Sequence, residues 1–170
     1  MSTDELVDLF HHRWAPPALA LLGERGGARF VELQRRLGVG RESLRRALGR
    51  LGELGYVSPN TGYGHPLRPE YLLTREGRRA ARLAARVLAS GDQDTLLRKW
   101  SVPVLAELTE ERRFSELYAS LPGVTPRALA LALQELESAR LVTREVRATR
   151  PPSTAYRATA EGRRIQRALR

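Results

Sequence analysis

The sequence contains no cysteine, which excludes disulfides, thiolate zinc sites and switching by cysteine oxidation. Lys99 is the only lysine, so almost all of the positive charge is arginine. No apolar run approaches the roughly 18 residues that suggest a membrane-spanning helix. The first residues, MSTDELVDLF, are acidic and amphipathic, unlike a secretory signal. These absences predict a cytoplasmic protein without a membrane partner.

The charge is strongly unbalanced. There are 29 Lys and Arg residues against 19 Asp and Glu, which gives a net charge of +10. Such an excess favours a polyanionic partner, most commonly nucleic acid, with an anionic membrane surface as the alternative. The planar fork of arginine suits phosphate and guanine edges. A GC-rich genome would also enrich arginine, so the composition alone does not decide the partner.

The chain contains an internal repeat with an offset of about 85 residues. The stretch RFVELQRRLGVGRESLRRALGRLGELGYV in the first half matches RFSELYASLPGVTPRALALALQELESARLV in the second. Matched residues include these pairs: Trp14 and Trp100, Pro17 and Pro103, Leu44 and Leu129, Leu48 and Leu133, Tyr71 and Tyr156, Thr74 and Thr159, Gly77 and Gly162. The repeat predicts two copies of one fold, at residues 1–90 and 91–170.

Each half has the same predicted order of elements. In the first half, a helix begins near Trp14, a second begins at Arg29-Phe30, and a turn and a longer helix with a leucine face follow. Two short strands come next, around residues 56–57 and 71–73, and Thr74 then caps another helix. This order predicts a mainly α fold with small β-hairpin wings (α+β), in the form of two tandem winged helix-turn-helix domains.

Residues 128–133 read ALALAL, an alternation that is typical of a strand. However, Ala and Leu are strong helix formers, Thr125 is a good N-cap and Pro126 a good first helical residue. The spacing of Leu129, Leu133 and Leu136 places them on one helical face. We therefore predict that ALALAL forms the first turns of a helix.

The second half resembles the HxlR-type winged-helix transcriptional regulators. The resemblance rests on W-x-x-x-x-L-x-x-L, RFSEL, LPGVTPRALALALQELE, LV-x-RE, the Pro151-Pro152 pair and Y-x-x-T-x-E-G. It implies a nucleoid-associated regulator that binds double-stranded DNA. Typical members have one such domain and act as homodimers on pseudo-palindromic DNA. The duplication leaves two assemblies open, a homodimer and a single-chain pseudo-dimer. The cysteine-based oxidant sensing of several members cannot apply, and an unidentified small-molecule effector remains a candidate partner.

In a winged helix, the helix after the turn lies in the major groove. With the leucine face toward the core, the outward residues of the first half are Arg41, Ser43, Arg45, Arg46 and Arg50. Arg46 lies nearly opposite the core, where base contact is most direct. Ala130 and Leu131 replace Arg45 and Arg46 in the second half. The polar candidates that remain there are Thr125, Arg127 and Gln134.

The candidate wings show the opposite bias. The first has only His65 and Arg68, whereas the second has Arg144, Arg147 and Arg150, which suit phosphate or minor-groove contact. We therefore expect the first half to read bases with its helix and the second to anchor with its wing.

A protein-interaction module is an alternative class of function. The apolar ALALAL helix also suits a protein-interaction module without sequence-specific DNA reading. Two segments are candidate dimer interfaces, the N-terminal helix with Leu6, Val7, Leu9 and Phe10, and REGRRAARLAARVLAS. We find no nucleophilic triad, no phosphate-binding glycine loop and no carboxylate pair, so neither an enzyme nor a cofactor or metal site is predicted.

Overall fold

The computed structural model describes residues 1–60, 70–148 and 153–170. These form two compact units. The first unit is His12–Leu88, and the second is Ala89–Arg170 together with Met1–His11. Among the described residues, no helix is long and apolar enough to cross a bilayer.

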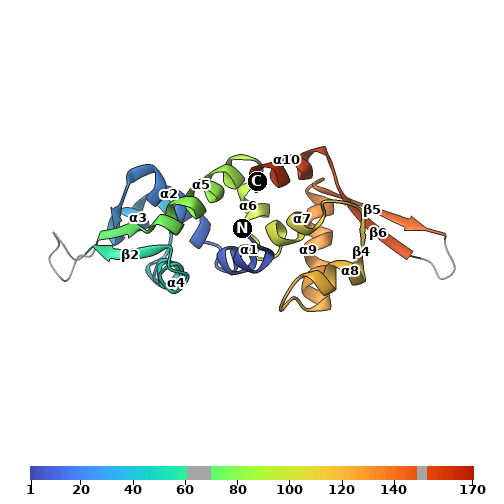
Figure 1. Cartoon of the computed structure of the whole chain (residues 1–170), viewed down its shortest axis with the longest axis horizontal. Coiled ribbons are helices and arrows are strands. Elements are labelled where there is room, and N and C mark those ends of the chain that lie inside the picture. Colours follow the sequence, from blue (N-terminus) through green and yellow to red (C-terminus); the bar gives the residue numbers. More distant parts are fainter. Residues whose placement is uncertain (61–69, 149–152) are drawn as a thin grey trace. The chain divides into compact units, whose positions relative to one another are not determined.

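The first unit packs its helices against a three-stranded antiparallel sheet of order β1-β3-β2. Its elements are α2 (Ala15–Arg25), β1 (Ala28–Arg29), α3 (Phe30–Leu37), α4 (Arg41–Glu53), β2 (Val57–Asn60), β3 (Glu70–Leu73) and α5 (Arg75–Ala89) (Figure 1). Leu33, Leu44 and Leu51 have no exposed surface. The predicted leucine face is therefore the core face of α4.

From α7 to α10, the second unit has the same order of elements as the first, and its sheet has the order β4-β6-β5. Its elements are α6 (Gln93–Leu96), α7 (Ser101–Glu107), β4 (Arg112–Arg113), α8 (Phe114–Ser120), α9 (Pro126–Ser138), β5 (Val142–Arg147), β6 (Ser153–Ala158) and α10 (Ala160–Ala168) (Figure 1). The fold is thus mixed α+β, mostly helical with small antiparallel sheets and winged-helix-like, as the sequence predicted.

The helix α1 (Thr3–Phe10) packs against α7, in the second unit. The Thr3 hydroxyl donates a hydrogen bond to the Glu107 carboxylate of α7. Leu6, Leu9 and Phe10 are almost completely buried. These residues, considered above for a dimer interface, therefore do not belong to the exposed surface.

The predicted helix at ALALAL is confirmed, because these residues lie within α9. The Thr125 hydroxyl accepts a hydrogen bond from the Ala128 amide at 3.2 Å, and Pro126 is the first helical residue. Leu129, Leu133 and the other core-facing residues of α9 are buried. The helical cap and the buried leucine stripe therefore outweigh the strand-like alternation.

A threonine and a glycine fix the start of α5. The Thr74 hydroxyl donates to the Gly55 carbonyl at 2.7 Å and accepts from the Gly77 amide at 2.9 Å. A Cβ on Gly77 would lie 1.8 Å from the Tyr56 carbonyl oxygen, so only glycine allows this close approach.

The same contacts fix the start of α10. The Thr159 hydroxyl donates to the Arg140 carbonyl at 2.8 Å and accepts from the Gly162 amide at 3.1 Å. A Cβ on Gly162 would lie 2.2 Å from the Leu141 carbonyl oxygen. Each unit thus joins its first wing strand to its last helix in the same way.

Candidate nucleic-acid interface

Helix α4 buries one face and exposes its basic residues on the other. Leu44, Ala47, Leu48 and Leu51 are buried. Arg41, Ser43, Arg45 and Arg46 are exposed, and the side chains of Arg45 and Arg46 are 62% and 69% accessible. This gives α4 a basic outer face with hydrogen-bond donors in its first two turns, as expected from the spacing of its leucines.

Glu42 organises the two most exposed arginines. Its carboxylate accepts hydrogen bonds from Arg45 Nη1 at 2.8 Å and from Arg46 Nε at 3.3 Å. Glu42 was not among the predicted site residues, although a glutamate three and four residues before arginines on a helix is a recognisable pairing pattern. Glu42 therefore holds both guanidinium groups near each other on the outer face of α4.

The other two arginines of α4, Arg41 and Arg50, each contact a neighbouring side chain. The Arg41 guanidinium lies over the Phe30 ring, 6.0 Å from its centroid. Arg50 Nη1 pairs with Glu53 at 3.1 Å, and the Arg50 side chain is only 28% accessible. Arg45 and Arg46 are therefore better placed than Arg50 to reach a ligand on the exposed side.

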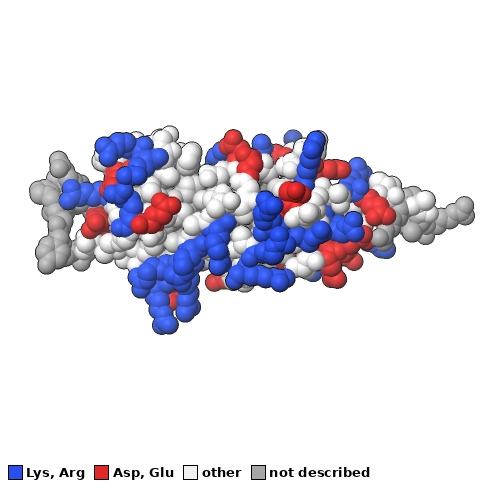
Figure 2. All heavy atoms as spheres, turned by 90° about the horizontal axis from the view of Figure 1, so that it is seen from above, with Lys and Arg blue, Asp and Glu red and all other residues white. Residues whose placement is uncertain are grey.

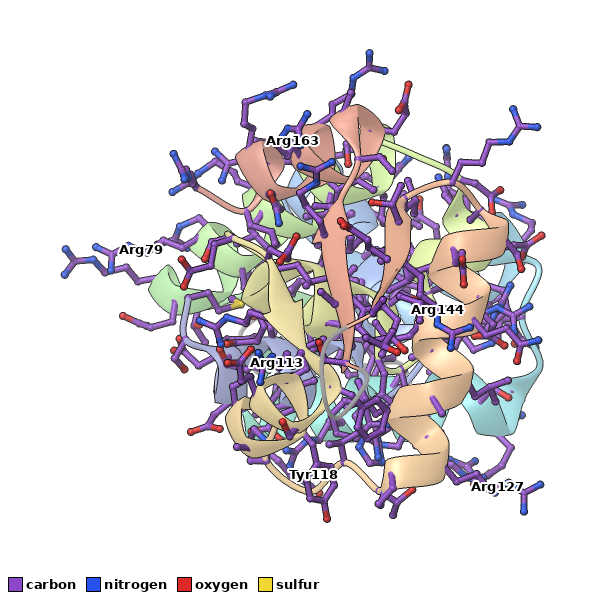
Figure 3. The ribbon with its side chains drawn as sticks, turned by 90° about the vertical axis from the view of Figure 1, so that its right-hand side faces the viewer. Arg79, Arg113, Tyr118, Arg127, Arg144 and Arg163 are labelled. Carbon is purple, nitrogen blue, oxygen red and sulfur yellow. The ribbon has the colours of Figure 1, made fainter. Side chains whose placement is uncertain are left out.

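Helix α9 exposes a different set of side chains. Arg127, Ala130, Leu131 and Gln134 face outward, and Leu131 is 53% exposed. Figure 3 shows Arg127 extending away from the ribbon. The Thr125 hydroxyl accepts the capping hydrogen bond from the Ala128 amide. The outer face of α9 is thus largely apolar where α4 has arginines.

Acidic side chains follow along α9. Glu135 pairs with Arg98, which precedes α7, and Glu137 is exposed. On the neighbouring α8, Tyr118 is 44% exposed and extends away from the helix (Figure 3). Tyr118 was not among the predicted site residues, since the sequence around an isolated aromatic residue on a short helix does not indicate whether it is exposed.

The two wings differ in length and in charge. Strands β5 and β6 have six residues each, whereas β2 and β3 have four. Arg144 is exposed on β5, and Arg147 is the last residue of that strand. The other three wing candidates, His65, Arg68 and Arg150, lie outside the described residues.

Basic side chains are abundant on the molecular surface. On the face drawn in Figure 2, Lys and Arg form several clusters, with Asp and Glu between them. A surface of this kind gives attraction to a polyanion, whereas the hydrogen-bonding groups on particular elements determine what is recognised.

The second unit is similar to a known protein family over most of its length. Residues 95–170 match the family model described as HxlR-like helix-turn-helix. This range covers α7 to α10, including α9 and the second wing. The resemblance inferred from the motifs of the second half is thus supported for this part of the chain.

Two relatives carry the name of uncharacterized HTH-type transcriptional regulators. The protein of Synechocystis sp. is 42% identical over 77 residues, which are 45% of this chain and 57% of the relative. The protein of Methanothermobacter thermautotrophicus is 40% identical over 68 residues, 39% of this chain and 52% of the relative. The chain thus spans about half the length of these relatives.

Solved structures also show similarity. A transcriptional regulator of the MarR family from Enterococcus faecalis has 36% identity and a TM-score of 0.43, over 45% of this chain and 70% of its own. The redox regulator HypR in its oxidized form has 32% identity and a TM-score of 0.43, over 45% of this chain and 79% of its own.

Proposed function

We propose that this chain is a sequence-specific transcriptional regulator that binds double-stranded DNA. In this proposal, α4 lies in the major groove and reads bases, while the basic wing of the second unit contacts the backbone or the minor groove. The two units, His12–Leu88 and Ala89–Arg170 with Met1–His11, act as tandem winged helix-turn-helix domains, close to the halves 1–90 and 91–170 that the repeat predicts. The names of the relatives and the match to an HxlR-like family support the general class.

The observation that carries the proposal is the exposed arginine pair on α4. Arg45 and Arg46 project from the face opposite the buried leucines, and Glu42 holds them together. An arginine fork that binds the O6 and N7 atoms of guanine contributes about 1–3 kcal/mol of base discrimination. Arg46, the more exposed of the two, is our first candidate for this contact.

The second wing supplies the sequence-independent part of binding. Arg144 is exposed on β5, and an arginine at this position is suited to phosphate contact. Each phosphate that the protein neutralises steepens the salt dependence of binding by about 0.9 in the log–log slope. Arg144→Ala should therefore reduce affinity for specific and random DNA equally.

The proposal is tested by binding to genomic fragments with and without excess random competitor DNA. We expect one fragment to survive competition with the wild-type protein. Arg46→Ala should lower the affinity for that fragment by roughly 5- to 150-fold while it changes binding to random DNA far less. The dissociation constants for both DNAs give the two effects separately.

Arg79→Ala provides the matched control. Arg79 is exposed on α5 and extends away from the ribbon (Figure 3), so its loss changes the charge equally without touching α4. If Arg46→Ala and Arg79→Ala weaken specific and random binding by the same factor, only the electrostatic attraction is present, and the base-reading role of α4 is wrong.

A protein-interaction module is the second candidate function. It is favoured by two of the exposed apolar residues of the second unit, Tyr118 on α8 and Leu131 on α9. This alternative predicts that every DNA fragment is bound alike, and that a bound partner protein survives nuclease treatment but is lost in Leu131→Asp.

A further inference from the structure

The two helices that follow the turns are alike in build and different in surface. Both α4 and α9 have 13 residues, and both bury a stripe of leucine and alanine. With Leu44 set against Leu129, they can be compared position by position. Several exposed positions differ, and three of them lie at the arginine pair and its glutamate: Glu42, Arg45 and Arg46 in α4 against Arg127, Ala130 and Leu131 in α9. At another, Gln134 of α9 stands where α4 has Gly49.

At these three positions the two helices differ in the hydrogen-bonding groups that could contact a base edge. On α4, Glu42 holds two guanidinium groups, which together present a broad array of donors. On α9, Ala130 and Leu131 have no side-chain hydrogen-bonding group, and the exposed polar side chains that remain in its first three turns are Arg127 and Gln134. An apolar side chain contacts only the methyl group of thymine in the major groove, whereas Arg, Asn and Gln discriminate through paired hydrogen bonds.

We propose that each chain discriminates bases in a single block of DNA, under α4, and that α9 lies on a second stretch of duplex without selecting its sequence. This inference rests on the proposed function. The DNA recognised by one chain is then asymmetric. It has one block of base pairs in which a substitution weakens binding strongly (the demanding block), and one stretch in which a substitution has little effect (the tolerant stretch). In an assembly of several chains, the number of demanding blocks equals the number of bound chains.

The carboxylates of α9 are consistent with a helix that does not discriminate bases. Glu135 occupies the position that Arg50 has in α4, and Glu137 is exposed two residues further along the helix. Glu135 is held by Arg98, which lowers its repulsion of phosphate. Arg127 remains as the exposed cation of α9, a residue suited to one backbone contact. Gln134 is exposed about one turn beyond Ala130 and Leu131, further from the N-terminal part of the helix that contacts base edges. Helix α9 therefore has fewer groups than α4 for reading bases.

The chain offers a pair of charge-neutral exchanges as the test. The variant Arg127→Glu/Ala130→Arg/Leu131→Arg puts the α4 residues onto α9. The reverse variant, Glu42→Arg/Arg45→Ala/Arg46→Leu, puts the α9 residues onto α4. All six positions are exposed, so the core is untouched. The net charge is the same in all three proteins, which holds the non-specific attraction nearly constant.

The experiment selects binding sites from random duplex DNA with the full-length chain. Every base pair of the best site is then substituted in turn, and native mass spectrometry counts the bound chains. For the wild type we expect one block per bound chain in which a substitution costs roughly 5- to 150-fold in affinity. Substitutions in the tolerant stretch should cost less than about threefold, since only a methyl contact is lost.

The variants extend the test. Sites selected with the first variant should contain two demanding blocks per chain, and the reverse variant should select none while it keeps salt-dependent binding. Two demanding blocks per chain in the wild type would overturn the inference. It would also fall if the first variant, shown to unfold at the wild-type temperature, still selected a single block. If the wild type selects no sequence at all, the proposed function itself has failed.

Discussion

The two units of the chain use one framework and carry two different surfaces. The framework positions are the same: a threonine that caps the last helix, a glycine that meets a backbone carbonyl, and a leucine stripe on the 13-residue helix. The exposed positions of that helix differ, arginines on α4 and alanine and leucine on α9. Core and cap residues decide whether the unit folds, whereas solvent-exposed residues contribute little to folding and are available for recognition.

The difference between the units also bears on the comparisons. The family match covers residues 95–170, the unit with the apolar α9. The candidate base-reading residues lie in the other unit, on α4. Similarity in the framework therefore does not identify which helix would contact bases in the proposed function, because base contact depends on particular side chains.

The largest expected effects test the shared framework. A Cβ at Gly77 or Gly162 would lie 1.8 Å or 2.2 Å from a backbone carbonyl oxygen, so Gly77→Ala and Gly162→Ala force the backbone to move. We expect each to destabilise the protein by about 1–3 kcal/mol, with the larger loss for Gly77→Ala, in urea unfolding followed by circular dichroism.

Gly49→Ala is the control for these variants. Gly49 lies within α4, and an added Cβ there would meet nothing within 4 Å. Alanine is favoured over glycine in a helix interior by about 0.5–1 kcal/mol, so this variant should be more stable than the wild type. A protein with alanine at position 77 that unfolds at the wild-type urea concentration would refute the steric role of that glycine.

A smaller effect tests the difference in surface. Glu42→Gln removes the charge that holds Arg45 and Arg46, and both arginines become available to phosphates. Exposed ion pairs of this kind contribute only about 0.3–0.5 kcal/mol, so affinity for random duplex should rise about twofold. The ratio of specific to random affinity should fall, because the arginine pair is less well oriented.

The variant Glu53→Gln is the control that distinguishes the orientation of Arg45 and Arg46 from the change in net charge. Glu53 lies on the same helix and pairs with Arg50, and its substitution changes the net charge equally. We expect Glu53→Gln to leave the ratio of specific to random affinity unchanged. An equal fall in both variants would mean that charge alone, and not the pairing with Arg45 and Arg46, sets the ratio.

The helical elements could be predicted from the sequence because local signals agree with the packing. Thr125, Pro126 and the leucine spacing predicted α9 despite its alternating pattern, and Thr74 predicted the start of α5. The short strands β1 and β4 were not predicted. Each has two residues, and each exists only because β3 or β6 lies beside it.

Long-range contacts account for what the sequence did not indicate. An amphipathic pattern in Thr3–Phe10 predicted a face to be covered, but not that α7, about a hundred residues away, would cover it. The pairing of Glu42 with Arg45 and Arg46 was readable in principle from its spacing. The exposure of Tyr118 was not, since it depends on which residues of α8 the rest of the unit covers.

The most direct test of the account is methylation interference on the selected DNA site. Methylation at guanine N7 blocks the acceptor that an arginine fork uses in the major groove. We expect methylation of a guanine in the demanding block to prevent binding of the wild-type protein, and the same modification to have no further effect on Arg46→Ala. If no guanine interferes, or if the wild type and Arg46→Ala give the same pattern, α4 does not read the major groove through Arg46 and the central claim is wrong.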